Sequence, residues 1–522
     1  MKRTEGPAAP GRRLATAALI VVAATAASRV FGYVREIAAA AYYGAGAAKS
    51  AFDVAFLIPS TVQVLVAQAA LTAALIPVLS GLIEKGERQE AWRVARTVFT
   101  LVAIILGATV IICIIFAPRI MPLFAPGYRG DAAMMADIVY MTRLLFPTVV
   151  LLAITGVVVS ILNSYEHFTL PALAPVFWNV VIVAAIVAGS DRFGIEAMAW
   201  GVLLGTLVQL AMQLPWLRGR GGRLGLSLDL KNRHVRQVGA LMLPVSLSLG
   251  LINLNGVVDV QFASYLGDGA VAAMNYAFRL YQLPEALFAI AVGTVLFPTL
   301  SKLAARGDRD GFRDSLTRGL RVIFFLLIPI SAFILVLSEP LVRLAYEHGR
   351  FTPEDTRVVG STLFFFAFGS AFSGGSALLT RGFFSLSQPW TPTVVALGNI
   401  AVNALLNWIL IRWFDLGGIA LSTTLVSTVT FFILLFMMRR RLGRIDGRAI
   451  VRSALTVTLF SALAALAAYA AWRGVDFSLG RGLAGQLLSL SAALATCAAI
   501  MAILSRASGL AEWRLLLTLR RS

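Results

Sequence analysis

The chain has 522 residues, of which 58% are hydrophobic and 14% are charged, and its formal net charge is +19. Soluble domains usually carry about 25% charged residues, so this composition excludes an ordinary soluble protein of the same length. The basic residues are spread between apolar runs and do not form one polar stretch, which argues against binding to nucleic acid.

Fourteen apolar segments follow one another along the chain, and they have the lengths expected of helices that cross a bilayer with roughly 20 residues. They cover residues 14–43, 50–83, 94–117, 132–163, 170–190, 194–217, 237–265, 270–301, 319–338, 358–384, 391–411, 417–438, 453–472 and 482–505. Strands of a membrane barrel would be shorter and would alternate in polarity. We therefore predict an all-α polytopic membrane protein with 14 transmembrane helices.

The first segment follows a basic start, "MKRTEGPAAPGRR", and has features of a secretory signal peptide. Its apolar pattern continues past Ser28 to Tyr43, so we interpret it as a retained first span. With a cytoplasmic N-terminus, 30 Lys and Arg residues fall in cytoplasmic segments, 10 in outer connections and 5 inside the spans. Lys and Arg accumulate on the cytoplasmic side of membrane proteins, so this bias predicts that both termini are cytoplasmic.

The first two segments carry ionisable residues where a lipid-facing span would carry none. These are Arg29, Arg35 and Glu36 in "SRVFGYVREIAAAAYYGAG", and Asp53 in the second segment. Seven residues make nearly two helical turns, so Arg29 and Glu36 are expected on one face. Charges in a span should face a partner or a water-filled cavity. Two interpretations stay open: ion pairs that lock the bundle, or a cationic chamber that binds a phosphate or carboxylate.

The chain contains an internal repeat with a constant offset in residue number. "LIPVLSGLIEKGER" (75–88) resembles "LFPTLSKLAARGDR" (296–309), so that Pro77 pairs with Pro298, and "SYEHFTLP" resembles "SLSQPWTP" at the same offset. Each copy holds an even number of spans, so the two copies should be parallel, as in transporters that bind their substrate between two halves. We predict two parallel six-helix repeats plus two C-terminal helices. The expected boundaries are 1–217 for the N-terminal lobe, 218–440 for the C-terminal lobe and 441–522 for the added helices.

The second half carries its own polar residues inside the spans. The eighth segment holds Arg279, which could face the arginines of the first half, and Glu285. Another group combines Asp259 with Asn403, Asn407 and neighbouring hydroxyls. Oxygen ligands of this kind suit a hard cation such as sodium, but Asn and Thr also hydrogen-bond helices to one another in membranes. Both interpretations stay open for this group.

The residues offer little support for enzyme chemistry. The three histidines, His167, His234 and His348, lie in connections and show no metal-ligand spacing. The sequence contains no P-loop, so a direct use of ATP is not expected. We expect a transporter, with no catalytic residue and no cofactor beyond a sodium ion.

Four stretches together resemble the MurJ (MviN) family of lipid II flippases, within the multidrug/oligosaccharidyl-lipid/polysaccharide exporter superfamily. They are "SRVFGYVREIAAAAYYGAG", "SILNSYEHFTLPALAP", "YAFRLYQLPEALFAIAVGTVLFPTLSK" and "YEHGRFTPEDT", and the likeness runs from about residue 14 to 440. The resemblance implies that the protein flips undecaprenyl-diphosphate-linked peptidoglycan precursor, lipid II, to the outer leaflet of the bacterial inner membrane. Its partners would be lipid II or a related polyprenyl-diphosphate glycolipid and membrane lipids, and a monomer is expected.

The resemblance also implies roles for particular residues. Family positions that bind substrate fall on or near Arg29, Arg35, Glu36, Asp53 and Arg279, and a sodium site would use Asp259, Asn403, Asn407, Ile419 and Thr423. The last two spans correspond to the family's groove for the lipid tail.

One stretch departs from the family. An arginine pair followed by "AEGAF" is usual early in the second span, but this chain has Gln63, Val64 and Gln68 there. Alternatives are therefore a flippase for another polyprenyl-diphosphate glycan, a cation-coupled multidrug exporter, or a scaffold without transport.

Overall fold

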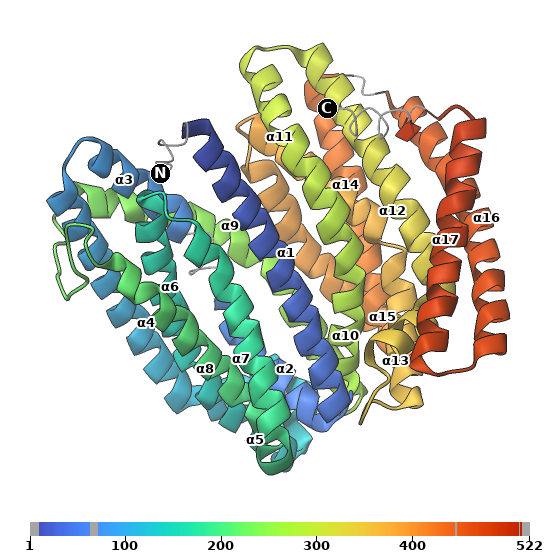
Figure 1. Ribbon diagram of the computed structural model, residues 1–522, viewed down its shortest axis with the longest axis horizontal. Coiled ribbons are helices and arrows are strands. Elements are labelled where there is room, and N and C mark those ends of the chain that lie inside the picture. The colour runs from blue at the N-terminus through green and yellow to red at the C-terminus, as the bar shows by residue number, and fades with distance from the viewer. Residues whose placement is uncertain (1–9, 63–70, 444–445, 511, 514–522) are drawn as a thin grey trace, which may run out of the picture. The chain divides into compact units, whose positions relative to one another are not determined.

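The computed structural model describes residues 10–62, 71–443, 446–510 and 512–513, and this part of the chain is built from helices without a strand. It divides into two compact units, unit 1 (Met1–Gly269) and unit 2 (Ala270–Ser522). Figure 1 shows the helices of each unit, coloured along the chain. The predicted all-α membrane fold is confirmed.

Unit 1 is a bundle of long helices joined by short connections. Its helices are α1 (Pro10–Tyr43), α2 (Ala47–Val62), α3 (Leu71–Glu84), α4 (Arg88–Phe124), α5 (Ala132–Leu145), α6 (Pro147–Ser164), α7 (Thr169–Phe193), α8 (Glu196–Gln213) and α9 (Arg233–Ala263), with short 3-10 turns at Pro126–Gly130, Leu214–Leu217 and Ser264–Leu266. Pro147 begins α6 directly after α5, because proline suits the first turn of a helix and cannot continue the preceding one.

The connections of unit 1 gather at two opposite ends. At one end, Trp92 Nε1 and Tyr165 Oη both donate hydrogen bonds to the carbonyl of Arg220, at 3.0 and 2.8 Å. At the other end, the backbone N–H of Gly127 donates to Ser264 Oγ at 2.9 Å. The helices therefore run up and down through the unit, as consecutive spans must.

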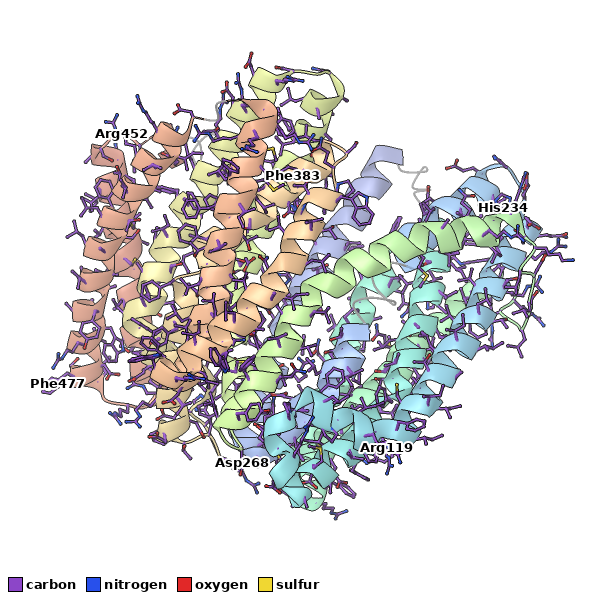
Figure 2. All side chains as sticks on the ribbon, turned by 180° about the vertical axis from the view of Figure 1, so that it is seen from behind. Arg119, His234, Asp268, Phe383, Arg452 and Phe477 are labelled. Carbon is purple, nitrogen blue, oxygen red and sulfur yellow. The ribbon has the colours of Figure 1, made fainter. Side chains whose placement is uncertain are left out.

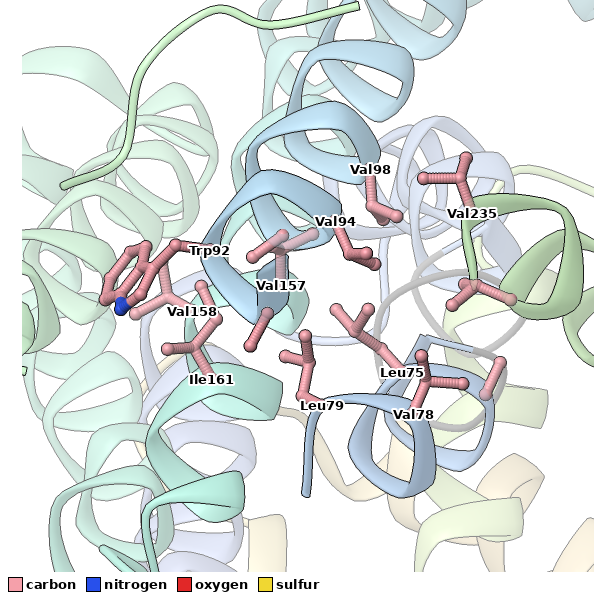
Figure 3. Packing of buried hydrophobic residues seen from close by; sticks show 14 of the residues in the cluster. Leu75, Val78, Leu79, Trp92, Val94, Val98, Val157, Val158, Ile161 and Val235 are labelled. Atoms are coloured by element: carbon pink, nitrogen blue, oxygen red, sulfur yellow. The ribbon is translucent and has the colours of Figure 1, made fainter. Parts of the chain in front are cut away.

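A core of apolar side chains fills one end of the bundle, between α3, α4 and α6. Figure 3 shows Leu75 and Leu79 of α3 facing Val94 of α4 and Val157 of α6, and all four are fully or almost fully buried. Val235, at the start of α9, packs against the same cluster. This packing explains why α9 belongs to unit 1.

Unit 2 repeats this plan and adds two helices. Its helices are α10 (Ala270–Pro284), a π-helical turn η5 (Glu285–Ala289), α11 (Ile290–Ala305), α12 (Arg309–Tyr346), α13 (Pro353–Ala367), α14 (Ser370–Ser385), α15 (Trp390–Leu442), α16 (Gly447–Leu479) and α17 (Leu483–Ala507). Two of its spans are bent: α10 and α11 meet at 42°, and α13 and α14 meet at 48°.

Helix α15 is a hairpin of two helical halves. The chain turns at Asp415, whose φ of 47° and ψ of −128° are not helical. Asn399 Nδ2 donates to Thr430 Oγ1, and Asn403 Nδ2 donates to Ser422 Oγ. The later residue of the first half, Asn403, contacts the earlier residue of the second half, Ser422, so the two halves run antiparallel. This agrees with the two separate segments, 391–411 and 417–438, that the sequence predicts.

The C-terminal helices α16 and α17 pack on α12 through an apolar cluster that includes Leu337, Val457 and Ala493. Figure 1 shows the two helices side by side, and Figure 2 shows Arg452 and Phe477 near the two ends of α16. Salt bridges join α12 to α16 at one end, and α12 to the segment after α17 at the other. The appended helices are thus an integral part of unit 2.

The backbone confirms the internal repeat. Helices α4 and α12 begin at Arg88 and Arg309, and α6 and α14 end at Ser164 and Ser385, both at the offset that the sequence shows. Three further pairs with positive φ keep this offset: Gly86 and Gly307, Glu166 and Ser387, and Gly194 and Asp415. The hydrogen bond that ends the preceding helix also recurs at this offset. The N–H of Glu87 donates to the Leu82 carbonyl, and the N–H of Asp308 donates to the Leu303 carbonyl.

Each expected apolar segment falls on a helix, on two consecutive helices or on one half of α15, except that residues 63–70 of the segment 50–83 lie outside the described residues. Within the described residues, eight helices are long and apolar enough to span a membrane, or ten if each bent pair counts as one span. The number 14 stays a prediction, as do the lobe boundaries. The observed division lies between residues 269 and 270, after α9, whereas the sequence places the first boundary between residues 217 and 218.

Candidate functional site

The first predicted site residues lie on α1, which packs against α7. Arg35 Nη2 donates to Glu36 Oε1 at 2.6 Å, and the two side chains are only 11% and 9% exposed. The Arg35 guanidinium also lies 5.1 Å from the centre of the Trp178 ring on α7. A cation over an indole face is stabilised by the ring quadrupole, so Arg35 is held from two sides.

Arg29 lies in a different environment from Arg35. It is exposed on α1 and makes no ion pair with any residue that the structure describes. Arg29 and Glu36 lie seven residues apart on the continuous helix α1, and the ion pair that the structure gives for Glu36 is with its direct neighbour Arg35. Arg29 therefore keeps a cationic group available for a ligand.

A second buried pair begins α2. Lys49 Nζ donates to Asp53 Oδ1 at 2.6 Å, one helical turn apart, and the side chains are 2% and 10% exposed. A buried lysine is rare unless it is paired. Asp53 is thus neutralised within its own helix and does not present a bare negative charge.

The predicted cationic residue of unit 2, Arg279, is exposed on α10. Its neighbours Ala277 and Tyr281 are buried, so the helix presents the guanidinium on its open face. Arg29 and Arg35 lie in unit 1 and Arg279 in unit 2, so their convergence on one ligand stays a prediction.

The predicted sodium ligands divide between the units. Asp259 is buried on α9 of unit 1 at 9% exposure, whereas Asn403 and Asn407 are buried in the first half of α15 in unit 2. Asn407 Nδ2 donates to Asn403 Oδ1 at 3.2 Å, and Ser422 Oγ donates to the Asn403 carbonyl at 3.2 Å.

The remaining predicted ligands, Ile419 and Thr423, are joined by a 3.3 Å hydrogen bond from Thr423 Oγ1 to the Ile419 carbonyl. These contacts place the predicted ligands on α15 in the two halves of one hairpin, and the hydrogen bonds between Asn403 and Ser422 join the halves. Whether they also bind sodium stays a prediction.

The departure from the family in the second span lies outside the described residues, which leave out Gln63, Val64 and Gln68. Lys49 and Trp178 lie near the site and were not among the expected residues. The four-residue spacing of Lys49 and Asp53 could have indicated their pair, whereas nothing local relates Trp178 to Arg35, which lies far earlier in the chain.

A surface hollow of about 510 Å³ lies where the connection before α9 meets the start of α4. Its lining mixes Glu87, Glu90 and Asp229 with Arg93, Lys231 and Arg233. Because both charge signs are present in similar number, this hollow does not provide a cationic site for an anionic ligand.

Comparison with known proteins identifies similarity along most of the chain. The family model described as "Lipid II flippase MurJ" matches residues 39–493. The probable lipid II flippase MurJ of Rhizobium meliloti is 32% identical over 488 residues, which are 91% of this chain and 90% of that protein. The lipid II flippase MurJ of Burkholderia cenocepacia is 30% identical over 494 residues, 94% of this chain and 95% of that protein.

The fold is similar to that of a solved structure. A lipid II flippase MurJ in an inward closed conformation superposes with a TM-score of 0.79 at 23% sequence identity, covering 94% of this chain and 99% of that one. At this identity the likeness concerns the fold.

Proposed function

The chain belongs to the MurJ family of lipid II flippases, and from this membership we propose that it carries lipid II from the cytoplasmic to the outer leaflet by alternating access. The observation that supports this most strongly is the family match over residues 39–493, which runs from the end of α1 through both repeats and α16 into α17. A transporter of this kind needs no catalytic residue, since it moves its substrate unchanged.

The substrate headgroup carries a diphosphate, and the exposed arginines of the two units suit it. Arg29 is exposed and without an ion pair among the described residues, so its guanidinium can donate to phosphate oxygens. Guanidinium forms bidentate bonds with phosphate and keeps its charge at any physiological pH. In this proposal Arg29 and Arg279 bind the headgroup, while Glu36 and Trp178 hold Arg35 in a fixed orientation.

The membrane potential supplies a driving force for this direction of transport. An inside-negative potential favours outward movement of an anion by about 2.3 kcal/mol per charge per 100 mV. Sodium bound by Asp259, Asn403, Asn407, Ile419 and Thr423 would then reset the inward-open state. The groove for the prenyl tail would lie along α16 and α17.

This function fits a protein of the bacterial inner membrane that has both termini in the cytoplasm. The basic connections of unit 1 support it, because residues around Arg88, Tyr165 and Arg220 meet at one end of the unit. In unit 2, Arg313 Nη1 donates to the Leu442 carbonyl, which joins the basic start of α12 to the basic end of α15. We infer that these ends face the cytoplasm.

The departure at Gln63, Val64 and Gln68 favours one alternative, a flippase for another polyprenyl-diphosphate glycan. That substrate keeps the diphosphate but differs in the sugar or peptide, so the arginine roles would be unchanged. A cation-coupled drug exporter is disfavoured, because exposed arginines repel cationic substrates.

The test is complementation of a bacterial strain depleted of its own lipid II flippase. The wild-type chain should restore growth, and Arg279→Ala should not, although it reaches the membrane at the same level. Arg357→Ala is the matched control, since Arg357 is 71% exposed and pairs only with Glu354. Failure of the wild-type chain, or growth with Arg279→Ala, would contradict the proposal.

A further inference from the structure

A carboxyl group lies at the break between α10 and α11. Glu285 is the first residue of the π-helical turn η5, and it follows Pro284, which lacks a backbone N–H donor. Single π-turns inside α-helices are uncommon and are frequent at functional sites. Here the turn coincides with the 42° bend of the span.

The second bent span of unit 2 touches the first at this carboxyl. Ser373, in the first turn of α14 just after the 48° bend, donates from Oγ to Glu285 Oε1 at 2.9 Å. The next residue, Gly374, lies so close to η5 that a Cβ added there would be 3.2 Å from Ala289 Cβ. One hydrogen bond and one close glycine contact therefore join the two bends.

Among the residues that the structure describes, none pairs an opposite charge with Glu285. Ile323 and Leu327 of α12, which would contact a Cβ at Gly374, are apolar, and Tyr281 of α10 is buried. Glu285 forms no ion pair with any described residue. The structure also describes no ion pair to Glu285 from any basic residue on the elements packed against this turn. These basic residues are Arg279 of α10, which is exposed, Arg381 of α14, which contacts Thr294 on α11, Lys302 near the far end of α11, and five arginines of α12, Arg309, Arg313, Arg318, Arg321 and Arg343.

Glu285 is only partly exposed, and a carboxylate with one serine donor and no cation is costly to remove from water, so this arrangement favours the protonated acid. Ionisation would leave a charge that the Ser373 hydroxyl solvates poorly. A conformation in which water reaches the break would then be preferred.

The other repeat carries no such polar pair in its sequence. At the repeat offset, Glu285 corresponds to Val64 and Ser373 to Leu152, both apolar. The first copy of the six-helix plan therefore has apolar residues at both positions, and the carboxyl is a feature added to the second.

We propose that Glu285 is a proton-binding site that couples the two bent spans of unit 2. With the proton bound, the carboxyl and Ser373 hold both bends together, as in this structure. When the proton leaves to water, the contact opens and the α11 end of the unit moves relative to α16. The proposed ligand is a proton. The experiment below distinguishes it from a monovalent cation bound at the same carboxyl.

The experiment measures a distance inside unit 2 by pulsed electron paramagnetic resonance in lipid nanodiscs. Spin labels are attached at Ala305→Cys, on the exposed end of α11, and Arg452→Cys, on α16 (Figure 2), after the two native cysteines are replaced. In the wild type, the distance between the two labels should change between mildly acidic and alkaline buffer, and its pH dependence should fit the titration of a single proton. Glu285→Gln should give the acidic distance at every pH.

Two controls make the result decisive. Glu354→Gln removes a carboxyl that is 66% exposed and should titrate like the wild type. Ser373→Ala keeps the carboxyl but removes the link, so the pH-dependent shift should be lost, and this variant decides the matter if Glu285→Gln does not fold. A wild-type distance independent of pH, or one that follows sodium at constant pH, would overturn the proposal, as would titration of Glu285→Gln.

Discussion

The salt bridge between Arg343 of α12 and Asp476 of α16 should hold the C-terminal helices on unit 2. The side chains are 11% and 16% exposed, and the guanidinium also lies 5.9 Å from the centre of the Trp472 ring. Removing one partner of a buried pair leaves an uncompensated charge and costs about 3–5 kcal/mol, whereas an exposed pair contributes only about 0–1 kcal/mol. Because both groups keep a little solvent contact, we expect Asp476→Asn to cost about 3 kcal/mol, at the lower end of the buried range.

The assay is reversible unfolding in mixed micelles, which gives the free energy of unfolding for each variant. Arg343→Met combined with Asp476→Leu should lose less than the sum of the single changes, since no charge remains buried, with a coupling of about 1–3 kcal/mol. Glu354→Gln breaks an exposed pair with similar charge chemistry and should cost under about 1 kcal/mol. Equal small losses for Asp476→Asn and Glu354→Gln would refute the reasoning.

Gly418→Ala should destabilise the α15 hairpin by about 1–3 kcal/mol in the same assay, because overpacking strains a close contact. Its Cβ would meet the Leu410 carbonyl oxygen at 2.4 Å, whereas nothing lies within 4 Å of a Cβ at the control position Gly398. Burial alone would raise the pKa of Glu512, but hydrogen bonds from Ser453 and Arg321 lower it below the ordinary glutamate value. The contribution of Glu512 is therefore complete above the ordinary value and is lost as the pH falls through the lowered pKa. Thermal midpoints recorded against pH should fall more steeply on acidification for the wild type than for Glu512→Gln, and parallel curves would contradict this.

Much of the architecture could be predicted from the sequence, because apolar length and the internal repeat are visible without a structure. The turn of α15 at Asp415 lies in the expected gap between the segments ending at 411 and beginning at 417. The bends within the eighth and tenth segments were not expected, since Pro284 and the residues around Ser370 lie in continuous apolar runs.

The candidate site was predictable only in part. Arg29 and Arg35 are recognisable because a charge in an apolar run needs a reason, but their different surroundings depend on contacts distant in sequence. Trp178 reaches Arg35 only once α1 packs on α7. In the same way, Ser373 lies far along the chain from Glu285, so the junction of the two bends appears only in the folded chain.

The most direct measurement of the central claim is flipping by the purified protein. In proteoliposomes that hold fluorescent lipid II in both leaflets, a membrane-impermeant quencher should reach the inner-leaflet headgroups over time when the wild-type protein is present. The Arg279→Ala protein should leave them protected, as should liposomes without protein. No movement of lipid II by the wild type, with movement of a different polyprenyl-diphosphate glycan under the same conditions, would contradict lipid II as the substrate.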